Sequence, residues 1–142
     1  MKTVFLFFML AYGLSAQAQV LITEKEAALP PSSTVATRAI TRGPAIRVVS
    51  PDPASAVVKS PFAFKIGFEP KGGAKIDPAS VKVVYVKSPS VDLLDRVKTG
   101  ISEKGIVLES AQAPVGEHQI RVTVQDTEGR QTSQIIAFTV AN

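Results

Sequence analysis

Hydrophobic and polar residues alternate over much of the chain after residue 44, in short segments separated by turn residues. The clearest case is PFAFKIGFEP at 61–70, where Phe or Ile occupies every second position. A period of two with one apolar face is typical of a half-buried strand in an antiparallel sheet. We predict further strands at 45–50, 80–87, 105–111, within 114–130 and at 131–140.

The spacing of these strands predicts the fold class. Turn signals such as Lys71-Gly72-Gly73 recur roughly every ten residues, which favours an all-β sandwich over βαβ units. About six or seven strands then form one domain over 45–142. The segment SPSVDLLDRVKTG interrupts the alternation, with Val91, Leu94 and Val97 every third residue. It predicts a short helical turn near 90–99, capped by Ser90.

The N-terminal part of the chain has a different character. Lys2, a short apolar run and the small residues of Ala16-Gln17-Ala18 predict a signal peptide over 1–18, too short to span a membrane. The mature protein would start at Gln19 and be exported. Residues 19–44 lack a sustained apolar period, so we predict a flexible N-terminal segment. Its apolar residues 20–22 could pair with a sheet edge, but a frayed end is favoured.

Composition narrows the chemistry. The 142 residues include no cysteine, which excludes disulfides, thiol catalysis and cysteine-based zinc sites. The formal net charge is +4, but the lysines are scattered among apolar and turn residues. Scattered charge of this kind is typical of solvated strand faces, so nucleic-acid binding is not predicted.

The segment PVGEHQIRVTVQDTEGR at 114–130 carries a recognisable pattern: a Pro-x-Gly turn, a histidine, alternating apolar residues and Asp-x-x-Gly. It resembles the penultimate strand of bacterial immunoglobulin-like domains, a group that includes cadherin-like repeats. The segments at 60–70 and 76–83 agree with this resemblance, which covers about residues 46–140. The resemblance implies an immunoglobulin-like antiparallel sandwich and leaves the function open, because such modules serve many roles. The chain lacks the cysteine pair and tryptophan of antibody domains and the calcium-binding cluster of cadherin-like repeats.

His118 is the only histidine and the first candidate for chemistry. It is in phase with Ile120 and Val122, which predicts an inward-facing side chain. In immunoglobulin-like folds a tyrosine at this place bonds back to a neighbouring connection, and the resemblance implies the same role for His118. A catalytic triad lacks a nucleophile motif, and metal binding with Glu117 or Asp126 is a weaker alternative.

The other candidates are also interpreted as structural. Asp126 to Arg130 predict a turn that closes the last hairpin, with Gly129 at positive φ, rather than a calcium loop. Asp92 and Asp95 are spaced like paired carboxylates but are interpreted as a solvated surface. Tyr85 is predicted to pack inward with its hydroxyl near an edge. We therefore assign no catalytic, cofactor-binding or metal-binding residue.

These observations favour an exported, non-enzymatic domain that contacts another protein at the cell envelope or outside the cell. An exposed sheet edge, or the segment 20–22, would add a strand to the partner. The alternative is a periplasmic accessory or ligand-binding module for an anionic glycan or a metal ion. An enzymatic function is the third and least favoured hypothesis.

Overall fold

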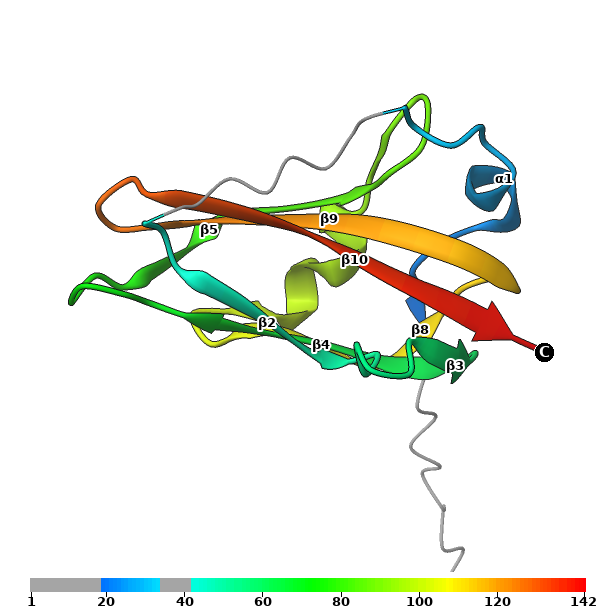
Figure 1. Cartoon of the computed structure of the whole chain (residues 1–142), viewed down its shortest axis with the longest axis horizontal. Coiled ribbons are helices and arrows are strands. Elements are labelled where there is room, and N and C mark those ends of the chain that lie inside the picture. Colours follow the sequence, from blue (N-terminus) through cyan, green and yellow to red (C-terminus); the bar gives the residue numbers. More distant parts are fainter. Residues whose placement is uncertain (1–18, 34–41) are drawn as a thin grey trace, which may run out of the picture.

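The computed structural model describes residues 19–33 and 42–142, and it contains two β-sheets packed face to face (Figure 1). One sheet has the order β1-β8-β4-β2, with β7 also paired to β8, and the other has the order β3-β10-β9-β5-β6. In chain order the elements are β1 (Gln19–Val20), α1 (Glu24–Ala27), β2 (Ala45–Ser50), β3 (Val57–Lys59), β4 (Phe62–Glu69), β5 (Ile76–Tyr85), β6 (Val91–Asp92), α2 (Leu94–Val97), a 3-10 turn (Lys98–Gly100), β7 (Ile101–Ser102), β8 (Gly105–Gln112), β9 (Gly116–Asp126) and β10 (Gln131–Ala141).

The predicted all-β sandwich is confirmed. Alternate residues of β4 are buried, as the period of two predicts, and the same pattern holds on the inner face of β9. The strand orders β2-β4-β8 and β5-β9-β10 correspond to the A-B-E and C-F-G groups of an immunoglobulin-type sandwich. The largest fully buried side chains are Tyr85, Phe64, Leu21, Ile22, Leu93, Ile106 and Ile120.

The sheets are mixed rather than purely antiparallel, which corrects the prediction. Strand β1 runs parallel to β8, and β3 runs parallel to β10. After β2 the chain turns at Asp52, whose carbonyl accepts hydrogen bonds from the backbone of Ser55 and Ala56. The chain then crosses to the second sheet, where β3 pairs with β10 and runs parallel to it. The four short strands β1, β3, β6 and β7 raise the number of strands above the predicted seven, because segments of two or three residues show no period.

The prediction of a flexible N-terminal segment over 19–44 is wrong for residues 19–33. Leu21 and Ile22 are 0% and 2% exposed and belong to the core. Their backbone N–H groups donate to the carbonyl of Gln112 at 2.8 and 3.2 Å. Burial of two large aliphatic side chains contributes to the free energy that orders this segment. At the C-terminal end of the predicted segment 19–44, Gly43 and Pro44 are also buried.

The predicted helical turn exists but differs in detail. Helix α2 and the following 3-10 turn cover Leu94–Gly100, which overlaps the predicted region 90–99. Leu93 and Val97 are the fully buried residues, whereas Leu94 is only partly buried, so the predicted apolar stripe is wrong by one position. The carboxylate of Asp92, rather than Ser90, accepts a hydrogen bond from the first turn, at 2.9 Å from Leu94 N.

The predicted signal peptide, residues 1–18, and residues 34–41 of the N-terminal segment lie outside the described residues. Among residues 19–33 and 42–142, no helix has the length and apolar character needed to cross a membrane.

Candidate functional site

His118 lies in the core near the start of β9. The register places Phe138 of β10 directly opposite and Tyr85 of β5 diagonally across, since Tyr85 pairs with Ile120. The ring centroids of Phe138 and Tyr85 lie 5.5 and 5.8 Å from that of His118. The imidazole is 2% exposed, so it belongs to the packed interior rather than to a solvent-accessible cleft.

Both ring nitrogens of His118 have a partner. Nε2 is 2.7 Å from the carbonyl oxygen of Pro114, which only accepts, so Nε2 carries the proton. Nδ1 then accepts from the Tyr85 hydroxyl at 2.8 Å. Burial lowers the pKa of His118 below its ordinary value, with the ammonium of Lys87 contributing, although the Pro114 hydrogen bond works in the opposite direction. The side chain is therefore neutral at physiological pH and stabilises the turn before β9, as the resemblance implied.

Tyr85 differs from its prediction in one respect. Its ring packs inward as predicted, but its hydroxyl is bonded to His118 and the residue is 0% exposed. Burial raises the pKa of this phenol. The Nζ atom of Lys87 lies 5.6 Å from the centre of the Tyr85 ring, an arrangement that favours the cation.

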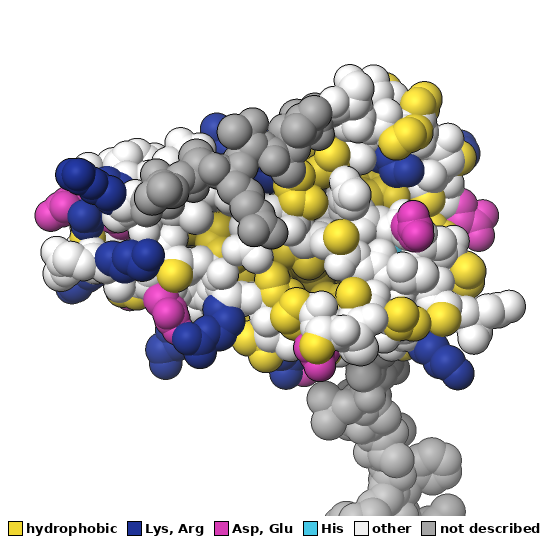
Figure 2. Space-filling model, in the orientation of Figure 1, with side chains coloured by type: hydrophobic (Ala, Val, Ile, Leu, Met, Phe, Trp, Pro, Cys, Tyr) yellow, Lys and Arg dark blue, Asp and Glu magenta, His cyan; other side chains and the backbone are white. Residues whose placement is uncertain are grey.

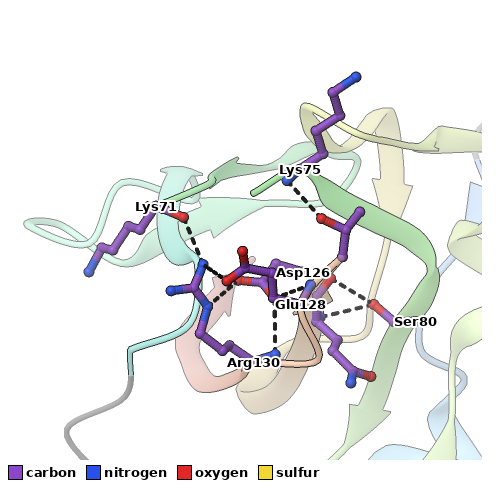
Figure 3. Close-up of polar contacts among 8 residues, drawn as sticks. Lys71, Lys75, Ser80, Asp126, Glu128 and Arg130 are labelled. Atoms are coloured by element: carbon purple, nitrogen blue, oxygen red, sulfur yellow. Dashed lines mark hydrogen bonds and ion pairs between the residues drawn. The ribbon is translucent and has the colours of Figure 1, made fainter. Parts of the chain in front are cut away.

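At the opposite end of β9, Asp126 organises the last hairpin (Figure 3). Its Oδ1 accepts from the backbone N–H groups of Glu128 and Arg130, and its Oδ2 accepts from Arg130 Nε at 2.9 Å. The Arg130 guanidinium also donates to the carbonyl of Lys71. Burial opposes ionisation of Asp126, but the hydrogen bonds from Arg130 and Glu128 outweigh it and lower its pKa. With Gly129 at φ 81°, the predicted turn is confirmed.

The candidate residues for metal binding are not brought together. His118 and Asp126 face the same interior but lie eight residues apart on one strand, about 26 Å in an extended chain. Glu117 points to the opposite face and is exposed. Within residues 19–33 and 42–142, no group of three His, Asp or Glu side chains could hold a metal ion.

An ion pair that the sequence did not predict fixes the N-terminal segment. Arg96 of α2 contacts Glu26 of α1 through two hydrogen bonds of 2.7 and 2.5 Å, and it also donates to the carbonyl of Leu21. Gln19 donates to the carbonyl of Arg96. Thr23 and Glu26 form a capping box at the start of α1. The side-chain hydrogen bond from Arg96 is the main reason that the pKa of Glu26 falls to about 2.

We expect Glu26→Gln to lower the free energy of unfolding by about 1–2 kcal/mol at pH 7. Because the pKa of Glu26 is 4.5 when unpaired and about 2 when folded, the stabilisation is complete above pH 4.5 and is lost as the pH falls toward 2. Urea unfolding at pH 7 and pH 3 measures both values. Glu24→Gln, on the same helix, is the matched control. An equal loss for Glu26→Gln at both pH values contradicts the ion-pair explanation.

A pocket of about 200 Å³ opens on the outer face of β5, beside the turn that follows it. Its lining residues are Ser32, Val84, Val86, Lys87, Ser88, Pro89, Ser90 and Arg121. The turn after β5 lies beside the N-terminal segment in Figure 1, where Ser88 N donates to the carbonyl of Pro30 and Pro31 pairs with Lys87. This pocket could not be predicted from the sequence, because part of its lining comes from an N-terminal segment that was predicted to be flexible.

No protein-family model matches the chain, and no curated protein matches it. Among solved structures the chain is similar to the crystal structure of CopC from Methylosinus trichosporium OB3b. The identity is 19%, the match covers 61% of this chain and 82% of that chain, and the TM-score is 0.41.

Proposed function

We propose that this protein is an exported, non-enzymatic, immunoglobulin-like domain that binds another protein through the open side of its sandwich. The observation that carries the proposal is the edge formed by β2 and β3. Within the described part of the chain, each is the last strand of its sheet, and β2, with six residues, is the longer. An unpaired strand edge offers backbone donors and acceptors to an extended segment of a partner.

Apolar side chains follow the same edge. Val49 and Val57 are 56% and 57% exposed, and Ile46 and Val48 are only partly buried although they contact the core. Figure 2 shows hydrophobic side chains gathered between β10 and β2 on this side of the molecule. Apolar exposure next to an unpaired strand supports contact with a partner that adds a strand and covers these side chains.

The N-terminal residues 20–22 are not part of this proposal. They were the second candidate for strand addition, but Leu21 and Ile22 are buried in the core of their own chain.

We also propose that the chain is related to the bacterial immunoglobulin-like domains. This proposal rests on the sequence pattern at 114–130.

A photo-crosslinking residue at position 49 tests the proposed edge in the cells that produce the protein. We expect one discrete crosslinked product, which excess untagged protein competes away. The same probe at Val107, which is 46% exposed on β8, is the matched control and should give no such product. Val49→Lys combined with Val57→Lys should reduce partner binding by at least about tenfold. Equal crosslinking from positions 49 and 107, or none from position 49, overturns the proposal.

A further inference from the structure

We infer that the pocket beside the turn after β5, lined in part by Lys87, Ser88, Ser90 and Arg121, binds the oxyanion group of a small ligand: a sulfate, phosphate or carboxylate. This site lies on a different part of the molecule from the β2–β3 edge. The inference therefore does not rest on the proposed partner contact.

The pocket is built from three separate segments. Val84 and Val86 of β5 belong to its lining, and Arg121 comes from the neighbouring strand β9, where it pairs with Val84. The turn 87–90 and Ser32 complete the lining. The hydrogen bond from Ser88 N to the Pro30 carbonyl, at 2.9 Å, joins the turn to the N-terminal segment. Leu21 and the Arg96–Glu26 ion pair in turn attach that segment to the core, so the turn and the N-terminal segment border the pocket together.

The charge of the pocket favours an anion. Arg121 has no acidic partner among residues 19–33 and 42–142, and neither has Lys87. Cross-strand neighbours of Arg121 are the apolar Val84 and Ile135. A guanidinium offers a planar fork of N–H donors that matches an oxyanion, and the Lys87 ammonium, 5.6 Å from the centre of the Tyr85 ring, adds a nearby positive charge.

The remaining lining groups suit the same chemistry. In the described part of the chain, the hydroxyls of Ser88 and Ser90 make no hydrogen bond to another side chain or to the backbone, so both can donate to an anion. The lining contains no aromatic residue on which a base or sugar ring could stack. A volume of 200 Å³ equals about seven water molecules, enough for one oxyanion and part of its hydration.

The negative charge of Asp92 allows a test of whether charge governs anion binding in the pocket. It pairs with Val84 on the side opposite to Arg121, about 10 Å from Arg121 across three strands. Its Oδ1 accepts from Leu94 N, a bond that an asparagine oxygen would keep. Removing this negative charge should therefore strengthen anion binding without loss of the helix cap.

The experiment titrates the mature protein with sodium sulfate and sodium phosphate at a constant ionic strength of about 0.15 M, followed by NMR of backbone and arginine N–H groups. We expect saturable shifts at Ser88, Ser90 and Arg121 with a dissociation constant on the order of 1 mM. Arg121→Gln should weaken binding about tenfold, and Asp92→Asn should tighten it about twofold. Lys82→Gln removes a charge from the same sheet face outside the pocket, at a distance from Arg121 similar to that of Asp92, and should weaken binding by about twofold at most, far less than Arg121→Gln.

Parallel titrations with acetate and glucuronate distinguish a free anion from the acid group of a sugar, because a sugar site binds glucuronate more tightly than acetate. If Arg121→Gln does not fold, Lys87→Gln gives the same readout. Shifts that do not saturate, that chloride reproduces, or that Lys82→Gln abolishes as fully as Arg121→Gln overturn the inference.

Discussion

Replacing Leu21 by alanine is expected to lower the free energy of unfolding by about 2–5 kcal/mol, as for a large aliphatic residue in the centre of a core. Leu21 is 0% exposed, and its side chain packs in the same cluster as the inner faces of both sheets. Its position only two residues after the predicted cleavage site would otherwise suggest almost no effect. The prediction therefore tests whether the sandwich needs its N-terminal segment.

The matched control is the preceding residue. Val20 is 46% exposed, so Val20→Ala should change stability by less than about 0.5 kcal/mol. Urea unfolding of the two variants provides the comparison. Hydrogen exchange adds a local readout, since Leu21 N–H donates to Gln112 and should be protected nearly as well as the central strands. If Leu21→Ala is as stable as Val20→Ala, the segment does not belong to the core.

The parts of the fold that could be predicted from the sequence are those in which the signal is periodic. Strand β4 has four alternating apolar residues and was placed almost to the residue. The burial of Leu21 could not be predicted in the same way. The preceding strand β1 has only two residues, and the position of Leu21 depends on the pairing of β1 with the edge of β8. Residues 19–22 show no period and are ordered here by their tertiary contacts.

The contacts that define the candidate sites join residues far apart in sequence. Strand parity correctly predicted that His118 and Tyr85 both face inward, but their contact depends on the register of β5 against β9. The Arg96–Glu26 pair spans 70 residues, and nothing in either local sequence indicates it. The start of helix α1 could have been predicted from the capping box at Thr23–Glu26, since a Thr followed three residues later by Glu marks a helix start.

Removing the hydrogen-bonding nitrogens of His118 is the second change with a large expected effect. His118→Phe keeps a ring in the core but leaves the Tyr85 hydroxyl and the Pro114 carbonyl without their partner. Each buried polar group left unpaired costs about 1–3 kcal/mol, so the variant should lose about 2–6 kcal/mol at pH 8. Tyr85→Phe, which removes one hydroxyl and leaves the Pro114 bond, should cost about 1–2 kcal/mol.

The pH dependence separates this role from simple packing. Burial lowers the pKa of His118 in the folded protein below its ordinary value of 6.5, so the unfolded chain binds the proton more readily. The stability that depends on neutral His118 is complete above pH 6.5 and falls as the pH drops below it, by at most about 1.4 kcal/mol per pH unit. The chain has one histidine, and the ordinary pKa of a histidine is the one side-chain value that lies near this range, so measurements from pH 7 to 5.5 report mainly on His118.

Urea unfolding of the wild-type protein and of His118→Phe at pH 7 and 5.5 measures the effect. We expect the wild type to lose stability over this range and the variant to stay nearly constant, while Tyr85→Phe keeps the wild-type slope. NMR of the imidazole nitrogens checks the same assignment, because a neutral ring with its proton on Nε2 is expected at pH 7. A wild-type protein whose stability does not change between pH 7 and 5.5, or an imidazole that titrates near 6.5, would show that His118 is not held neutral by its burial.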